Sequence, residues 1–191
     1  MPTNVLVSGA PERIAQVSQV LRAQDCTVVE VDDLANVPAA CKEAGENAFD
    51  AYLQLPATFG IEGSTALERL HHFYVKGVLA RFPAMDAAVP SLKPGGRVTV
   101  VAWSLPAEVA TDDDIEARRA LFRVLAHAAQ ADAGDDVAVR VLGSSASAED
   151  IVAAGLGKES SSSRPTSVET LSGVSYADWR VELLGLVSVE S

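Results

Sequence analysis

The first residues with chemical potential stand at the end of an apolar run near the N-terminus, Val5-Leu6-Val7-Ser8-Gly9-Ala10. A glycine turn between a buried strand and a helix is where an open α/β sheet binds the pyrophosphate of a dinucleotide. Asp32 follows the next apolar run, about 20 residues further on, where an acid accepts hydrogen bonds from an adenosine ribose. Arg13 lies early in the expected helix, where its guanidinium enters the space of the cofactor, meets a phosphate, or is an exposed side chain beside an empty site. We therefore predict Gly9, Arg13 and Asp32 as the remnant of a cofactor-binding site.

Histidine and cysteine residues do not have the spacing that metal sites need. His71 and His72 are adjacent, so on a helix they point about 100° apart, and His127 stands alone. Cys26 and Cys41 lack the close spacing of clustered metal ligands. We expect no metal site, and two unpaired cysteines indicate a reduced, cytoplasmic protein.

The elements that must position these residues alternate between strand and helix patterns. Short apolar runs predict strands at residues 5–7, 27–31, 49–55, 97–103 and 137–142. Helical spacing of apolar residues predicts helices between them, at residues 11–24, 36–46, 64–88 and 113–132, and residues 92–96 read as a turn. This alternation predicts an α/β fold, a Rossmann-like doubly wound parallel sheet in a three-layer α/β/α arrangement.

The last quarter of the chain has a weaker pattern. We expect one Rossmann-like domain over residues 1–191, with its core in residues 1–142 and an irregular C-terminal part in residues 143–191. That part contains a short predicted helix at residues 148–154 and four consecutive serines, Ser160 to Ser163, in a predicted mobile loop at about residues 157–167. The apolar stretch from Leu183 to Val189 predicts a sixth strand.

Charge and hydropathy exclude several classes of partner. The formal net charge is −11, so the surface repels phosphate backbones and anionic lipids, and we expect neither nucleic acid nor membrane as a partner. The sequence contains no apolar run long enough for a transmembrane helix. No basic stretch precedes the first strand, so we also expect no signal peptide.

Six segments, taken in order, resemble the short-chain dehydrogenase/reductase family. They are Val-Leu-Val-Ser-Gly-Ala at 5–10, Val-Val-Glu-Val-Asp at 28–32, Phe-Asp-Ala-Tyr-Leu-Gln-Leu-Pro-Ala at 49–57, Tyr-Val-Lys-Gly-Val at 74–78, Lys-Pro-Gly-Gly-Arg-Val-Thr-Val-Val at 93–101 and Arg-Arg-Ala-Leu-Phe-Arg-Val-Leu-Ala at 118–126. The resemblance implies that Gln54-Leu55-Pro56-Ala57 stands for the family's NNAG segment. It also places Tyr74 at a family asparagine, and Arg13 and Ala15 at the later glycines of the first turn.

The resemblance also shows where the family's chemistry is missing. It places Asp114 at the position of the catalytic Tyr, Arg118 at that of the Lys, and Trp103 or Ser104 near that of the Ser. No tyrosine occurs between Tyr74 and Tyr176, and an ionised carboxylate at Asp114 cannot replace a phenol as proton donor. A β-α step that the family has before its fourth strand is also missing between Asp32 and Phe49. We predict no catalytic residue.

These observations leave three functional hypotheses. The first is a non-catalytic, short-chain-dehydrogenase-like structural or assembly subunit, forming a homo-oligomer or a hetero-oligomer with a catalytic relative through the helices at 64–88 and 113–132. This hypothesis implies that no cofactor is bound, or that the cofactor is NAD if one does bind. The second is an NAD(P)-dependent oxidoreductase with an altered active site, using Ser104 or Asp114. The third and more distant one is an S-adenosylmethionine-dependent methyltransferase-like protein, which the segment Leu-Lys-Pro-Gly-Gly-Arg-Val at 92–98 also resembles.

Overall fold

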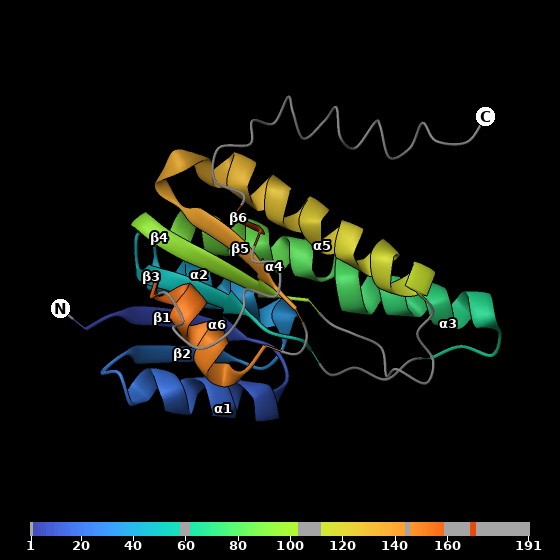
Figure 1. Cartoon of the computed structure of the whole chain (residues 1–191), viewed down its shortest axis with the longest axis horizontal. Coiled ribbons are helices and arrows are strands. Elements are labelled where there is room, and N and C mark those ends of the chain that lie inside the picture. The colour runs from blue at the N-terminus through green and yellow to red at the C-terminus, as the bar shows by residue number, and fades with distance from the viewer. Residues whose placement is uncertain (1, 58–61, 103–111, 144–145, 159–168, 171–191) are drawn as a thin grey trace.

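A six-stranded sheet forms the centre of the molecule (Figure 1). The computed structural model describes residues 2–57, 62–102, 112–143, 146–158 and 169–170, with residues 112–121 as backbone only. Five strands are parallel to one another, and the short last strand runs antiparallel to its neighbour, in the order β2-β1-β3-β4-β5-β6. Their bounds are β1 Asn4–Ser8, β2 Thr27–Val31, β3 Phe49–Gln54, β4 Leu92–Val101, β5 Ala138–Leu142 and β6 Glu169–Thr170.

Helices cover both faces of the sheet and make two separate apolar cores. On one face lie α1 Pro11–Arg22 and α6 Ala148–Gly155, and on the other lie α2 Val37–Ala44, α4 Arg81–Ala88 and α5 Asp112–Ala133 (Figure 1). Side chains alternate between the faces, so Val5, Val7 and Leu53 pack under α1 and α6, whereas Leu6 and Tyr52 pack under the other helices. The doubly wound, three-layer α/β/α fold predicted from the sequence is confirmed.

The helix predicted over residues 64–88 is divided into three parts. It consists of α3 Ala66–Phe73, a π-helical segment η2 Tyr74–Leu79 and α4. A reciprocal capping box starts α3, because the Glu68 N–H donates to the Thr65 hydroxyl at 3.2 Å and the Thr65 N–H donates to the Glu68 carboxylate at 3.1 Å. Segments of π-helix are often found at functional sites because they redirect side chains within a helix.

The turn predicted at residues 92–96 belongs instead to the start of β4. Leu92 pairs with Phe49, and the register then shifts before Arg97 pairs with Ala51. Gly95 has a φ of +79°, a conformation that L side chains rarely adopt, and it produces the irregularity. A glycine pair therefore makes a bulge within a strand rather than a turn before one.

The segment between β2 and β3 contains no strand. Residues 32–48 form the 3₁₀ turn η1 Leu34–Asn36 and α2, and β2 is therefore the edge of the sheet. This confirms the missing β-α step expected from the sequence. On β2 the side chains of Thr27, Val29 and Glu30 are exposed, and Arg22 of α1 pairs with Glu30 at 2.8 Å.

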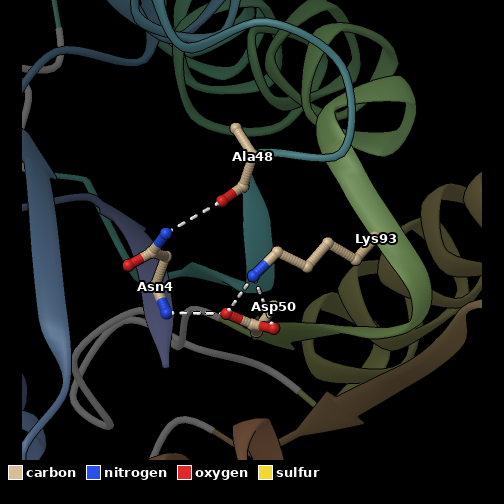
Figure 2. A network of polar contacts seen from close by, with 4 residues as sticks. All are labelled: Asn4, Ala48, Asp50 and Lys93. Carbon is tan, nitrogen blue, oxygen red and sulfur yellow. Dashed lines mark hydrogen bonds and ion pairs between the residues drawn. The ribbon is translucent and has the colours of Figure 1, made fainter. Parts of the chain in front are cut away.

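A polar network joins three strands at the amino end of the sheet (Figure 2). The Asp50 carboxylate accepts hydrogen bonds from the Lys93 ammonium at 2.8 and 2.9 Å and from the Asn4 N–H at 2.7 Å. The Asn4 amide in turn donates to the Ala48 carbonyl at 3.2 Å. Burial alone would raise the pKa of Asp50, but Lys93 and the Asn4 N–H outweigh it and hold that pKa below its ordinary value.

A buried glutamine fixes the connection from α5 to β5. The Gln130 amide nitrogen donates to the carbonyls of Gly134 at 2.7 Å and Val137 at 2.8 Å, and its oxygen accepts from the Val139 N–H at 3.1 Å. These bonds give hydrogen-bond partners to backbone groups that the irregular connection between α5 and β5 would otherwise leave unpaired. In the part of the chain that the structure describes, no helix is long and apolar enough to cross a membrane.

The Asp50 network yields a prediction about acid stability. Because the folded pKa is lowered, the carboxylate stabilises the native state above its unfolded pKa of about 4, and this stabilisation is lost as the pH falls below that value. Asp50 and Lys93 each leave 34% of the side chain exposed, so solvent screening limits the effect to about 1 kcal/mol. We expect Asp50→Asn to lose about that amount in urea unfolding at pH 7 and to match the wild type near pH 3. An equal loss at both pH values would contradict an ionic role.

Candidate functional site

The turn after β1 is tied directly to the segment that follows β3. Gly9 has a φ of +143°, and a Cβ there would lie 2.7 Å from the Leu55 Cβ and 2.9 Å from the Pro56 carbonyl oxygen. The Ala10 N–H donates to that Pro56 oxygen at 2.7 Å, and the Leu55 N–H donates to the Ser8 carbonyl at 2.7 Å. Gly9 is therefore required by the close approach of two protein segments.

This turn lies at the switch point of the sheet. From β1 the chain winds to β2 on one side, and β3 pairs with β1 on the other side. In open α/β sheets ligands bind outside the carboxyl ends of the strands at such a point, because the loops there diverge and leave a crevice. Here the loops after β1 and β3 are held together by the short bond between Ala10 and Pro56.

The start of α1 is poorly suited to an anionic ligand. Pro11 occupies the first helical turn and has no N–H to donate, and Glu12 places a carboxylate in the same turn. A diphosphate approaching this end of the helix would meet a like charge and one donor fewer than an ordinary helix offers. The residues present do not fit the cofactor's pyrophosphate.

Arg13 uses its guanidinium to contact the protein itself. One terminal nitrogen donates to the Ala146 carbonyl at 3.1 Å, and the other donates to the Gln16 side chain at 3.4 Å. Ala146 lies between β5 and α6, so Arg13 connects the first helix to the last loop of the parallel sheet. The charge of Arg13 is therefore already hydrogen-bonded within the protein.

Asp32 is placed as the sequence predicted, directly after β2 and next to the glycine turn. The Gly9 N–H donates to the carbonyl of Val31, the residue before Asp32, at 3.2 Å. The Asp32 side chain is exposed, whereas its neighbour Asp33 accepts from the Ala35 N–H at 2.9 Å and caps η1. Of the predicted site residues, Asp32 alone presents a group available to a ribose hydroxyl.

The structure adds a buried polar cluster that sequence reasoning missed. Ser8, Tyr52 and Gln54 are fully buried at the carboxyl ends of β1 and β3. The Ser8 and Tyr52 hydroxyls are 2.8 Å apart, and the Gln54 amide nitrogen donates to the Tyr52 oxygen at 3.2 Å. Burial raises the pKa of Tyr52 to about 12, so the phenol stays protonated at neutral pH and does not act as a base.

Arg81 is the central member of this cluster and is only 1% exposed. Its guanidinium donates to the carbonyls of Gly77 at 3.2 Å, Val101 at 3.1 Å and Leu55 at 3.3 Å. It also lies 4.8 Å from the centre of the Phe122 ring of α5, within range of a cation–π interaction. Burial lowers the pKa of Arg81 to about 10, which leaves the group charged at neutral pH.

The guanidinium thus fills the space between the carboxyl ends of β3 and β4. Both Leu55 and the last residue of β4, Val101, present their carbonyls to it, and the Gln54 amide donates to the Arg81 carbonyl at 3.2 Å. Leu55 stands in the segment matched to the family's NNAG sequence. The sequence does carry a signal for this group, because Arg81 is an isolated charge in the otherwise apolar stretch from Val78 to Ala84.

Other predicted positions have different outcomes. Ser104 lies outside the described residues, and so do Trp103 and most of the predicted mobile loop, residues 159–167; the predicted sixth strand at 183–189 lies outside them as well. Asp114 and Arg118 lie in α5, where the backbone alone is described. Tyr74, matched to a family asparagine, begins the π-helical segment and packs edge-on against Phe73. The described residues contain no group of histidines, cysteines and acids able to hold a metal ion.

Comparison with known proteins identifies the fold. No protein-family model matches this chain, and no curated protein matches it in sequence. A small-chain dehydrogenase structure has a TM-score of 0.61 and 16% identity, covering 82% of this chain and 89% of its own. A small-chain dehydrogenase solved with NADPH has a TM-score of 0.52 and 16% identity, covering 75% of this chain and 69% of its own. A structure from Burkholderia multivorans, described as that of a short-chain alcohol dehydrogenase, has a TM-score of 0.53 and 11% identity. The match covers 80% of this chain and 87% of that one. The chain has the Rossmann-like fold of the short-chain dehydrogenases.

The position of Arg81 predicts a large loss of stability on its removal. Arg81→Met keeps the length of the side chain but leaves the carbonyls of Gly77, Leu55 and Val101 without their donor, at a cost of about 1 kcal/mol each. We expect urea unfolding to show a loss of about 3 kcal/mol. Arg81→Lys keeps the charge without the planar fork and is also destabilised. The surface variant Arg22→Met is the control and costs less than about 1 kcal/mol. Equal stability of Arg81→Met and wild type would show that the guanidinium is dispensable.

Proposed function

We propose that this protein is a non-catalytic, short-chain-dehydrogenase-like subunit that supports the assembly of an oligomer. One observation carries the proposal: the Ala10–Pro56 bond joins the two loops at the switch point, and Arg81 joins the adjacent ends of β3 and β4 through Leu55 and Val101. These contacts disfavour a dinucleotide over the first turn, because they hold the loops after β1 and β3 close together. The sequence also lacks the Tyr and Lys that the family uses for proton transfer, with Asp114 and Arg118 at those positions.

The surface favoured for assembly is the helical layer that contains α3 and η2. Leu67 is 79% exposed, Leu79 is 50% exposed and Val75 is 37% exposed, all within one continuous stretch of helix. α3 extends past the ends of the strands (Figure 1), and its described side chains at residues 66–69 and 71 are all exposed. Exposed leucines on a projecting helix favour contact with another helix, either of a second copy or of a catalytic relative.

A second candidate function is an NAD(P)-dependent oxidoreductase with an altered active site. It is favoured by the exposed carboxylate of Asp32 beside the Gly9 turn and by a neighbour in fold that was solved with NADPH. The two functions differ in whether a dinucleotide binds.

Calorimetric titration separates the two functions. With NAD, NADP, NADPH and S-adenosylmethionine at up to about 1 mM, we expect no saturable heat, because the 2.7 Å bond between Ala10 and Pro56 holds together the loops that a dinucleotide would lie between. Binding of NAD below about 100 μM that weakens at least tenfold in Asp32→Ala would instead establish the oxidoreductase. Binding of S-adenosylmethionine alone would favour the methyltransferase-like alternative, and hydride transfer by the isolated chain would end the non-catalytic proposal.

The assembly surface is tested by light scattering on purified protein, alone and co-expressed with short-chain dehydrogenases encoded nearby. We expect a mass above that of the 20.0 kDa monomer, and a shift towards the monomer in Leu67→Glu and Leu79→Glu, because a charge on the apolar surface opposes its burial. Val29→Glu is the matched control, since Val29 is an exposed valine on β2, away from α3. A chain that stays monomeric with every partner would exclude an assembly role, and an oligomer unaffected by both leucine variants would exclude this surface.

A further inference from the structure

Two arginines lie next to each other on the face of the sheet that carries α1 and α6. Arg97 of β4 pairs with Ala138 of β5, and two residues later Thr99 pairs with Arg140. Residues in register on parallel strands point to the same face, so Arg97, Thr99 and Arg140 share one face. Val101 and Leu142, two residues beyond Thr99 and Arg140, belong to the core under α1 and α6, which identifies that face.

Neither arginine has an acidic partner in the described part of the chain. Arg140 is half-buried, and its Nε is shut off from solvent without an acceptor. Arg97 is also half-buried, and its guanidinium lies against Gly157, where a Cβ would collide with it. The ion pairs among the described residues join other side chains, Arg22 with Glu30 and Lys93 with Asp50.

Thr99, between the two arginines, has an unsatisfied hydroxyl. Its side chain is fully buried, and its Oγ1 has no hydrogen-bond partner among the described residues. A buried hydroxyl without a partner is costly, and so are two neighbouring guanidinium groups without a counter-charge. The chain as a whole has a net charge of −11, so two cations and an unused hydroxyl donor on one face make a locally positive site in an acidic protein.

We propose that Arg97, Thr99 and Arg140 form a binding site for an oxyanion, a phosphate or carboxylate group. Guanidinium groups donate in a planar fork that matches both anions, and the Thr99 hydroxyl supplies a further donor. An anion here neutralises the repulsion between the arginines and satisfies the buried hydroxyl at once. The site is separate from the Gly9 turn, because it lies within β4 and β5 and not at the carboxyl ends of β1 and β2.

The oxyanion at this site can come from two sources. One is a free phosphate or a phosphorylated or carboxylated small molecule. The other is the protein itself, because Thr170 of β6 pairs with Arg140 and the sequence after Thr170 contains the carboxylates of Asp178, Glu182 and Glu190. The test must therefore distinguish an added anion from one that the chain supplies.

Thermal unfolding of the full chain, with and without 10 mM inorganic phosphate at matched ionic strength in sodium chloride, tests the site. For a dissociation constant of about 1 mM, we expect phosphate to raise the midpoint by about 4 °C. The rise should disappear in Arg97→Met and Arg140→Met and remain in Arg22→Met, whose arginine is already paired with Glu30. Comparison with Arg22→Met accounts for the general stabilisation that phosphate gives to any folded protein.

A second set of variants tests the internal source. If the chain supplies the anion, the wild type does not respond to phosphate, whereas the full-length triple variant Asp178→Asn, Glu182→Gln, Glu190→Gln does respond, and adding Arg140→Met removes that response. Either pattern supports the oxyanion site and names its source. The proposal is overturned if neither the wild type nor the triple variant gains stability from phosphate beyond what the arginine variants gain. It is also overturned if Arg97→Met and Arg140→Met unfold at or above the wild-type temperature in every condition.

Discussion

The carboxyl end of this sheet depends on one buried cation, Arg81, which has no acidic partner in the described part of the chain. Withdrawing the Arg81 guanidinium from water is costly, and backbone carbonyls from η2, from the end of β4 and from the segment after β3 compensate for it. Each of these carbonyls belongs to a different part of the chain, so one side chain fixes their relative positions. Phe122 adds α5 to the same group through its ring.

A second set of contacts joins the loops at the switch point of the sheet. The loops after β1 and β3 are joined by the bond between Ala10 and Pro56, and Arg13 reaches the loop after β5. Two of the residues that the sequence predicted for a cofactor site, Gly9 and Arg13, thus also make contacts within the protein. A turn of this kind keeps its glycine for packing reasons, because the space beside Gly9 is filled by Leu55 and Pro56.

The loss of one β-α step has a separate consequence at the other side of the sheet. With no strand between β2 and β3, β2 becomes an edge, and α2 crosses to the face that carries α4 and α5. The Asp50 network compensates at the amino end by joining β1, β3 and the start of β4, which hold the central register.

Much of the architecture is determined by the sequence alone, because apolar runs and helical spacing report burial on two faces of a sheet. The five parallel strands, apart from the first residues of β4, the missing β-α step and the placement of Asp32 directly after β2 are readable in this way. What the sequence does not determine is which polar groups meet across the core. Arg81 contacts carbonyls of Leu55 and Val101, which are 26 and 20 residues away, and Arg97 and Arg140 become neighbours through strand register. Backbone carbonyls carry no residue-specific signal, and register is fixed by packing of the whole sheet, so the tertiary structure alone decided that Arg81 meets these carbonyls and that two arginines share one face.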